Sequence, residues 1–264
     1  MKVVQLKQNT EEWVEFRKGK SGGSSMNNLW KAGYPLKGQM LDKLIKSSRP
    51  LPDSKHQTVK ELAKLLTPEE IAEIKMYGAP KKKYYEMLAE KVSRPLTPND
   101  YADRLNGEPF SMMARGHILE PEIAKMFEEK TGKKLDPENN VWVNDKNPNS
   151  YISPDRCITS PDGKIKEAVE IKALSSPNVL EVWKTQKIPD EYYPQVVKYF
   201  IVNEDLETLY WVVGTDLIPG LEIQIFEVHR KDVERDIKEI AAFEEMILDM
   251  LAEDTKKIDE LSGF

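Results

Sequence analysis

The first pattern along the chain is a set of apolar residues that recur at the spacing of an α-helix. Between Met112 and Gly132 they predict one helix, which Gly132 is expected to end; they are Ile118, Leu119, Ile123, Met126 and Phe127. A second stripe predicts a C-terminal helix at about residues 231–254, where it serves core packing or a subunit contact; its members are Val233, Ile237, Ile240, Phe243, Ile247 and Leu251.

Shorter helices are expected in the N-terminal part of the chain. A short helix near Trp13 leads into a tight loop with the sequence KSGGSS at residues 20–25. Residues 41–92 have helical spacing, and the sequence TPEE at 67–70 is typical of a helix start with a capping box. That helix is expected to end at Gly78 and another to cover residues 81–92; the apolar positions before them are Leu62, Leu65 and Leu66.

β-rich segments follow, separated by Asn, Asp, Pro and Gly. They lie near residues 141–143, 151–159 and 164–173, and are followed by a helix at about 191–202 and by strands at 208–214 and 222–229. This order predicts an α/β fold with a mixed central sheet flanked by helices.

Composition narrows the class of protein. Hydrophobic residues make up 39% and charged residues 32% of the 264 positions, as in a globular protein with a charged surface. No apolar run approaches the roughly 20 residues of a membrane helix, and the N-terminus lacks the order of a signal peptide. We therefore expect an intracellular protein.

Cysteine and histidine usage limits the metal chemistry. The single cysteine, Cys157, excludes an internal disulfide, an iron–sulfur cluster and a cysteine-rich zinc site. The three histidines are far apart, so any metal site should be rich in oxygen ligands, which suits Mg²⁺ or Mn²⁺. The formal net charge of −6 argues against general adhesion to nucleic acid, although local basic patches remain possible partners for phosphate.

Carboxylates and a lysine are predicted to meet on one strand. Alternate residues of a strand face the same side, so Glu170 and Lys172 should point together while Val169 and Ile171 face the opposite layer. Asp155 can join them through a hairpin, and Glu120 from a helix. Neighbouring carboxylates repel one another, and a divalent cation relieves that repulsion and can support phosphodiester hydrolysis with a nearby lysine.

The tripeptide Ser-Pro-Asp occurs twice, ending at Asp155 and at Asp162. The second copy, followed by Gly163, has the composition of a tight turn and is expected to close the hairpin. Asp155 is therefore the predicted site residue, and Asp162 should lie at the solvent-exposed tip.

Five short motifs stand in a characteristic order between about residues 13 and 214. They are a block of Trp13, Arg17, Gly19 and Ser24; Gly116 with Glu120; SPD at 153–155; EIK at 170–172; and Tyr192 three residues before Gln195. This order resembles the PD-(D/E)xK nuclease superfamily and, within it, the phage lambda exonuclease and YqaJ-like viral recombinase family.

The resemblance implies a PD-(D/E)xK, restriction-endonuclease-like α/β core with a helical N-terminal region. Residues 1–264 would form a single nuclease domain. Its parts would be a helical insertion at about 36–79, a catalytic core at about 110–230 and the C-terminal helix at about 231–254.

It also implies roles for individual residues. Asp155, Glu170 and the backbone carbonyl of Ile171 would bind Mg²⁺, for which Mn²⁺ could substitute, with two ions per site; Glu120 would complete the acidic site or contact metal through water. Lys172 would position the attacking water. Gln195 and Tyr192 would support the site, and a 5′-terminal phosphate would be received by Arg17, Ser24, Ser153 and Tyr192. The basic residue that resembling proteins carry after the Glu-x-Lys strand is replaced by residues 175–178, so Lys184 or Lys187 could serve instead.

The implied function is a Mg²⁺-dependent 5′-to-3′ exonuclease. It would digest one strand of linear double-stranded DNA with a 5′-phosphate and leave 3′ single strands for phage-type homologous recombination. The resemblance further implies a homotrimer, an annealing-protein partner and a cytoplasmic location in a bacterium or phage-infected host. Two alternatives remain: a structure- or sequence-specific DNA endonuclease of the same fold, and a catalytically idle DNA-binding protein.

Overall fold

The computed structural model describes most of the 264-residue chain. The described residues are 1–8, 10–30, 33–53, 57–74, 83–84, 87–88, 91, 112–136, 140–216, 218 and 220–262. Within them, no helix is long and apolar enough to cross a membrane.

The strands form two sheets. A small antiparallel sheet has the order β1-β2-β3, and a larger one has the order β4-β5-β6-β7, in which β5 and β6 are parallel and the other pairs antiparallel. The bounds are β1 Lys2–Val4, β2 Val141–Val143, β3 Tyr151–Ile152, β4 Arg156–Thr159, β5 Ile165–Ala173, β6 Thr208–Gly214 and β7 Ile223–His229. The mixed strand orientation confirms the predicted α/β class.

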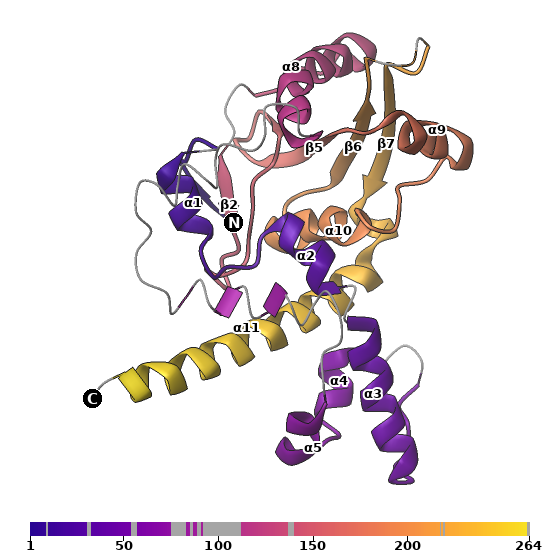
Figure 1. Cartoon of the computed structure of the whole chain (residues 1–264). Helices are drawn as coiled ribbons and strands as arrows, with labels where there is room; N and C mark the ends of the chain where they lie inside the picture. The colour runs from indigo at the N-terminus through magenta and orange to yellow at the C-terminus, as the bar shows by residue number, and fades with distance from the viewer. Residues whose placement is uncertain are drawn as a thin grey trace.

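Helices α8, α9 and α10 lie beside the larger sheet, whereas α3, α4 and α5 lie away from the strands, beyond α11 (Figure 1). The bounds of the helices are α1 Glu11–Arg17, α2 Gly23–Trp30, α3 Gly33–Lys46, α4 Val59–Ala63, α5 Pro68–Glu73, α8 Met112–Thr131, α9 Ser176–Thr185, α10 Tyr193–Val202 and α11 Glu234–Ser262, with a 3-10 turn at Arg230–Asp232. Helix α8 ends where predicted, before Gly132, whose φ of 69° is in the left-handed region that glycine adopts readily. The predicted capping box between Thr67 and Glu70 is also present.

The larger sheet carries a different layer on each face. Val169 and Ile171 of β5 pack with Val212 of β6 against Leu119, Ile123 and Phe127 of α8. The opposite face, with Trp211 of β6, packs against α9 and α10. Glu170 and Lys172 therefore face the α9 and α10 layer, because side chains alternate along β5.

A third core joins the N-terminal helices to the C-terminal one. It combines α2, α3 and α4 with α10 and α11, and its fully buried members include Met26, Leu29, Met40, Leu44, Leu62, Val197, Phe243 and Ile247. The predicted insertion at 36–79 thus contains helices that share a core with α11, and Figure 1 shows α3 and α4 side by side next to that helix.

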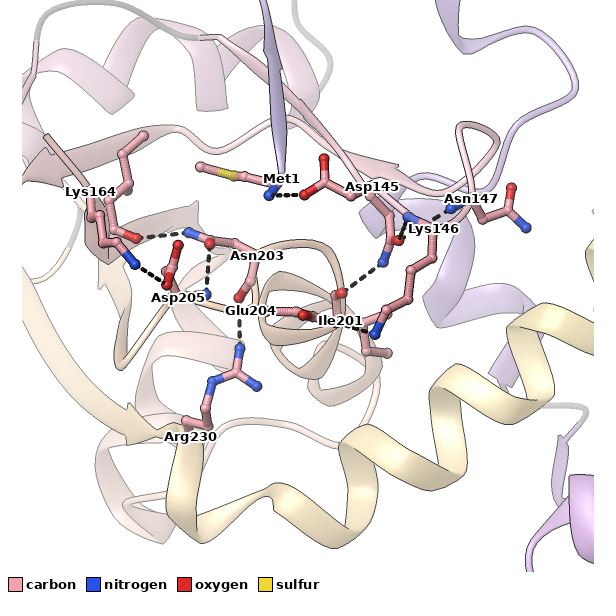
Figure 2. A network of polar contacts seen from close by, with 12 residues as sticks. Met1, Asp145, Lys146, Asn147, Lys164, Ile201, Asn203, Glu204, Asp205 and Arg230 are labelled. Atoms are coloured by element: carbon pink, nitrogen blue, oxygen red, sulfur yellow. Dashed lines mark hydrogen bonds and ion pairs between the residues drawn. The ribbon is translucent and has the colours of Figure 1, made fainter.

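Polar contacts fix the C-terminal end of α10 between neighbouring strands (Figure 2). Arg230 directly follows β7. Its guanidinium donates to the backbone carbonyls of Phe200 at 2.8 Å and of Asn203 at 2.6 Å. The Asn203 side chain donates to the carbonyl of Ile165 at the start of β5. These donors satisfy carbonyls that a helix end leaves unpaired, and they tie α10 to β5.

Some sequence-based expectations differ from the structure. Residues 151–159, expected as one β-rich segment, form β3 and β4 in different sheets, and Pro154 between them has no N–H to donate to a ladder. Leu65, expected on an apolar helix face, is 41% exposed, since α4 ends at Ala63. Helix α9 was not predicted, and α2 begins inside the KSGGSS run, at Gly23. Gly78 and most of residues 81–92 lie outside the described residues.

Candidate active site

Strand β5 places Glu170 and Lys172 side by side. The Lys172 ammonium forms an ion pair with Glu170 Oε1, and Glu170 is almost fully buried. The prediction that these two side chains share one face of the strand is therefore confirmed. Their neighbours Val169 and Ile171 are buried in the opposite layer, as expected from the alternation.

Asp155 approaches β5 at the point where its ladder with β4 ends. The last pair of that ladder is Arg156 with Val169, so continuing the register would put Asp155 opposite Glu170 and Pro154 opposite Ile171. The Ile171 N–H donates instead to the Asp155 carboxylate, at 2.6 Å. The Ile171 carbonyl points to the same side of the strand as the Ile171 N–H. Because proline has no N–H, Pro154 cannot donate a hydrogen bond to this carbonyl.

Helix α10 supplies two hydrogen-bond donors to the Glu170 carboxylate. Gln195 Nε2 donates to Glu170 Oε1 at 2.7 Å, and the Tyr199 hydroxyl donates to Glu170 Oε2. Gln195 and Tyr199 are both buried and lie one helical turn apart on α10. Glu170 is thus held through both of its oxygens.

The charges in this cluster shift the pKa of several groups, among them Asp155 and Lys172. Burial raises the pKa of Asp155 well above its usual range, the negative charges of Glu170 and Glu120 add to this, and Lys172 and the Ile171 N–H oppose it. Burial alone would lower the pKa of Lys172, but Glu170 and Asp155 together outweigh it and leave that pKa raised. Asp155 therefore lies close to the like charges of Glu170 and Glu120.

Glu120 reaches the cluster from α8 and is held by an arginine. Its Oε1 accepts from Arg156 Nη1 at 2.7 Å, and the same nitrogen contacts the Asp155 backbone carbonyl. Arg156, at the start of β4, was not identified from the sequence. It brings a second cation, besides Lys172, next to the three carboxylates.

Beside this cluster, Trp13 brings Arg17 and Ser153 together. The Arg17 guanidinium stacks on the Trp13 ring, with its central carbon 4.0 Å from the ring centroid, and Trp13 Nε1 donates to Ser153 Oγ at 3.4 Å. Arg17 Nε donates to the Tyr151 hydroxyl at 2.7 Å. No ion pair to Arg17 is found in the described part of the chain, so its terminal nitrogens can bind an anion.

Ser24 lies at the start of α2, close to this group. A side chain at Gly22 would clash with the Tyr151 hydroxyl, because its Cβ would lie 2.4 Å from that oxygen. The missing side chain lets the beginning of α2, with its exposed Ser24, approach the tyrosine that holds Arg17. A helix start also presents unpaired N–H groups that favour anions.

Of the remaining predicted residues, Tyr192 contacts the site, whereas no contact joins Lys184 or Lys187 to it in the described part of the chain. Tyr192 precedes α10, and the Lys172 ammonium lies 5.7 Å from the centroid of its ring. Lys184 and Lys187 are exposed at the end of α9 and just after it.

The repeated tripeptide separates as predicted. Gly163, with a φ of 78°, closes the hairpin between β4 and β5, and Asp162 is exposed at its tip. Cys157 is a buried residue of β4 whose thiol lies 3.4 Å from Asp136. Burial raises the pKa of this thiol to about 12.

The donor set suits a hard divalent cation. Among the described residues, no group of three or more His, Cys, Asp and Glu side chains is arranged to hold a metal ion. Asp155, Glu170 and the backbone carbonyl of Ile171 would supply oxygen donors of the kind that Mg²⁺ prefers. Burial is the main cause of the raised pKa of Asp155, and the repulsion from Glu170 and Glu120 that adds to it is what a bound cation would relieve.

Three residues of this cluster were missed from the sequence. Tyr199 could have been found, since it lies four residues after Gln195 and so on the same helix face. Arg156 and Asn27, which contacts Gln195 from α2, carry no such signal because their partners are distant in sequence.

The fold is shared with solved nuclease structures. The crystal structure of an alkaline exonuclease (LHK-Exo) from Laribacter hongkongensis aligns with a TM-score of 0.64 and 16% identity, over 96% of this chain and 98% of that one. The crystal structure of LHK-Exo in complex with dAMP aligns with a TM-score of 0.58 and 16% identity, over 96% of this chain and all of that one. This chain therefore has the α/β fold of the alkaline exonuclease structures.

Within that fold class, the chain belongs to the YqaJ-like viral recombinase domain family, which it matches over residues 12–206. The matched range contains every candidate site residue from Arg17 to Tyr199. The family resemblance drawn from the sequence motifs is thereby confirmed. A search of curated proteins found no significant match.

Proposed function

We propose that the protein is a Mg²⁺-dependent 5′-to-3′ exonuclease that digests one strand of linear double-stranded DNA. The family and the alkaline-exonuclease fold together indicate a DNA exonuclease, which is a phosphodiester hydrolase. The observation that carries the proposal is the meeting of Asp155 with Glu170 and Lys172 where the ladder between β4 and β5 ends.

Metal would be held by Asp155, Glu170 and the backbone carbonyl of Ile171. A bound Mg²⁺ would stabilise the charge that develops on the phosphate oxygens and lower the pKa of water. Mn²⁺ should substitute, and we expect two ions per site. Lys172, fixed against Glu170, positions the attacking water, while Gln195 and Tyr199 hold the Glu170 carboxylate in place.

The 5′-terminal phosphate would be bound next to this cluster. Arg17 is oriented by Trp13 and Tyr151, no residue that the structure describes forms an ion pair with its guanidinium, and Ser153 lies two residues from Asp155. Ser24 adds a hydroxyl at the start of α2. A phosphate anchored here would present the adjoining phosphodiester to the carboxylates, which supports exonuclease action from a 5′ end.

We further propose that the protein acts as a homotrimer in phage-type recombination, with an annealing protein as partner for the 3′ single strand. Both parts rest on the family. Light scattering on the purified protein tests the trimer, since the mass of a monomer is 30.4 kDa.

The function is tested with linear and closed circular DNA. The purified protein should release nucleotides from linear duplexes with 5′-phosphates, only in the presence of Mg²⁺ or Mn²⁺, and should leave closed circles intact. Lys172→Ala should lower the rate by about 100-fold or more, as expected for a residue that positions the nucleophile. Lys166→Ala is the matched control, because Lys166 lies on the same strand but pairs with Glu207 on the surface.

Two results would contradict the proposal in different ways. Discrete fragments from closed circles would indicate an endonuclease of the same fold. Full activity of Lys172→Ala would place the chemistry elsewhere.

A further inference from the structure

Asn27 connects α2 to the first turn of α10 through two hydrogen bonds. The backbone N–H of Gln195 donates to Asn27 Oδ1 at 2.8 Å, and Asn27 Nδ2 donates to Gln195 Oε1 at 3.4 Å. The two residues are 168 positions apart in the sequence. Asn27 contributes to none of the motifs that define the family resemblance.

The bond to the Gln195 N–H completes the start of α10. The residue before this helix, Tyr192, makes no capping hydrogen bond with its side chain, and Pro194 has no N–H. Gln195 is the third residue of the helix, and the N–H at that position usually donates a hydrogen bond to a capping side chain. Asn27 therefore acts as the cap of α10 from another helix.

The same contacts determine which way both side-chain amides point. A backbone N–H can only donate, so the Asn27 atom that it contacts must be the oxygen, and the Asn27 nitrogen faces Gln195. That nitrogen can only donate, so it faces Gln195 Oε1, which turns Gln195 Nε2 toward Glu170 Oε1 at 2.7 Å. The direction of each hydrogen bond follows from the one before it.

We propose that Asn27 is a positioning residue of the metal site, which acts on Glu170 by fixing the amide orientation of Gln195. The inference rests on the proposed function in one respect, that Glu170 is a metal ligand. With the Gln195 amide reversed, its oxygen would face the Glu170 carboxylate, and a stabilising contact would become a repulsive one. Asn27 and Ser24 both lie on α2. Asn27 therefore also links the proposed phosphate-binding segment to the metal site.

Asn27→Asp keeps one of the two hydrogen bonds and removes the other. The introduced carboxylate can still accept from the Gln195 N–H, so α10 remains capped, but it cannot donate to Gln195 Oε1. The Gln195 amide should then turn its nitrogen toward the introduced carboxylate and its oxygen toward Glu170. We expect Mn²⁺ binding to the DNA-free protein, measured by calorimetry, to weaken by about 10- to 100-fold, as for other residues that orient metal ligands.

Two further variants distinguish this role from a charge effect. Asn28→Asp makes the same change at the next, exposed position of α2 and should bind Mn²⁺ like the wild type. In a Gln195→Met background there is no amide to orient, so Asn27→Asp should have no additional effect on Mn²⁺ binding. Because the cap of α10 is kept, Asn27→Asp and Asn28→Asp should both fold with the helix content of the wild type, measured by far-UV circular dichroism.

Each contrary result has a distinct meaning. Equal Mn²⁺ affinity of Asn27→Asp and Asn28→Asp, or a persisting effect in the Gln195→Met background, would overturn the inference. If Glu170→Gln binds Mn²⁺ as well as the wild type does, the proposed metal site itself is wrong, and the inference falls with it.

Discussion

At the scale of single residues, Asp155 is held where its charge is unfavourable. It is partly buried beside Glu170 and near Glu120, and its pKa is raised well above the usual range by burial and by these charges. The hydrogen bond from the Ile171 N–H offsets only part of this cost. Such an arrangement lowers the stability of the metal-free protein in favour of a site that a cation would complete.

Asp155→Asn should therefore make the metal-free protein more stable and inactive. The asparagine oxygen can still accept from the Ile171 N–H, whereas the charge is removed. We expect the unfolding midpoint to rise by about 2 °C or more, the shift that roughly 1 kcal/mol produces in a chain of this size. Mg²⁺ should raise the midpoint of the wild type but not of the variant.

The matched control is Asp162→Asn at the exposed hairpin tip, which should change neither stability nor cleavage.

The pH dependence of the wild-type stability follows from the raised pKa of Asp155. Between the ordinary carboxyl pKa and the raised one, the folded chain keeps a proton that the unfolded chain has released, so wild-type stability falls as pH rises. The advantage of Asp155→Asn should grow over that interval, and an advantage that does not change with pH would contradict this account.

The placement of single residues was predictable where local chemistry decides it. The turn composition around Asp162 and the strand alternation at Glu170 and Lys172 both follow from neighbours in the sequence, and both predictions are confirmed. The hydrogen bonds of Asn27 depend on a contact between two helices far apart in the chain. No local pattern encodes that contact.

At the scale of secondary-structure elements, α10 is fixed by a buried ion pair as well as by its packing. Lys198 is fully buried and pairs with Glu244 of α11, and both contact the Ser150 hydroxyl. The Ser150 segment in turn forms a β-bridge with Ser21, just before α2. Burial lowers the pKa of Lys198, although Glu244 opposes that shift. One polar cluster thus joins α10, α11 and the loop before α2.

Lys198→Met should destabilise the fold strongly, because Glu244 would be left as an unpaired buried charge. We expect a loss of about 3–5 kcal/mol in the free energy of unfolding, measured in urea. The double variant Lys198→Met with Glu244→Leu should recover most of that loss, since both charges are removed together. If the double variant is as unstable as the single one, the loss of stability comes from removing the ion pair itself and not from leaving Glu244 as an unpaired charge.

Elements were predicted well where apolar periodicity is strong, as in α8 and α11. Helix α9 was missed because only Val179 and Val182 of its apolar residues are fully buried, while Leu180 and Trp183 are largely exposed. The division of residues 151–159 into two strands depends on which sheet each half joins. That choice is made by tertiary packing around Pro154.

At the scale of the whole molecule, α10 joins two hydrophobic cores. Val196, Tyr199 and Phe200 pack with the sheet, whereas Val197 and Ile201 pack with the N-terminal helices and α11. Neither core can lose α10 without exposing apolar surface of the other. The described parts of the protein should therefore unfold as one cooperative unit.

Val196→Ala and Val197→Ala test this coupling, because each truncates a fully buried side chain in a different core. Both should shift a single urea transition by roughly 2 kcal/mol. The transition should coincide when followed by far-UV circular dichroism and by tryptophan fluorescence. Two separate transitions, with one variant affecting only one of them, would show that the cores are independent.

The environment of Cys157 has a practical consequence for following digestion on single DNA molecules. It is the only cysteine of the chain, it is buried, and its pKa of about 12 keeps the thiol protonated and unreactive at neutral pH. A cysteine introduced at an exposed position, such as Asp162 at the hairpin tip, should therefore accept a maleimide dye selectively. The natural residue need not be replaced, so a fluorescent enzyme can keep an unaltered β4 beside its active site.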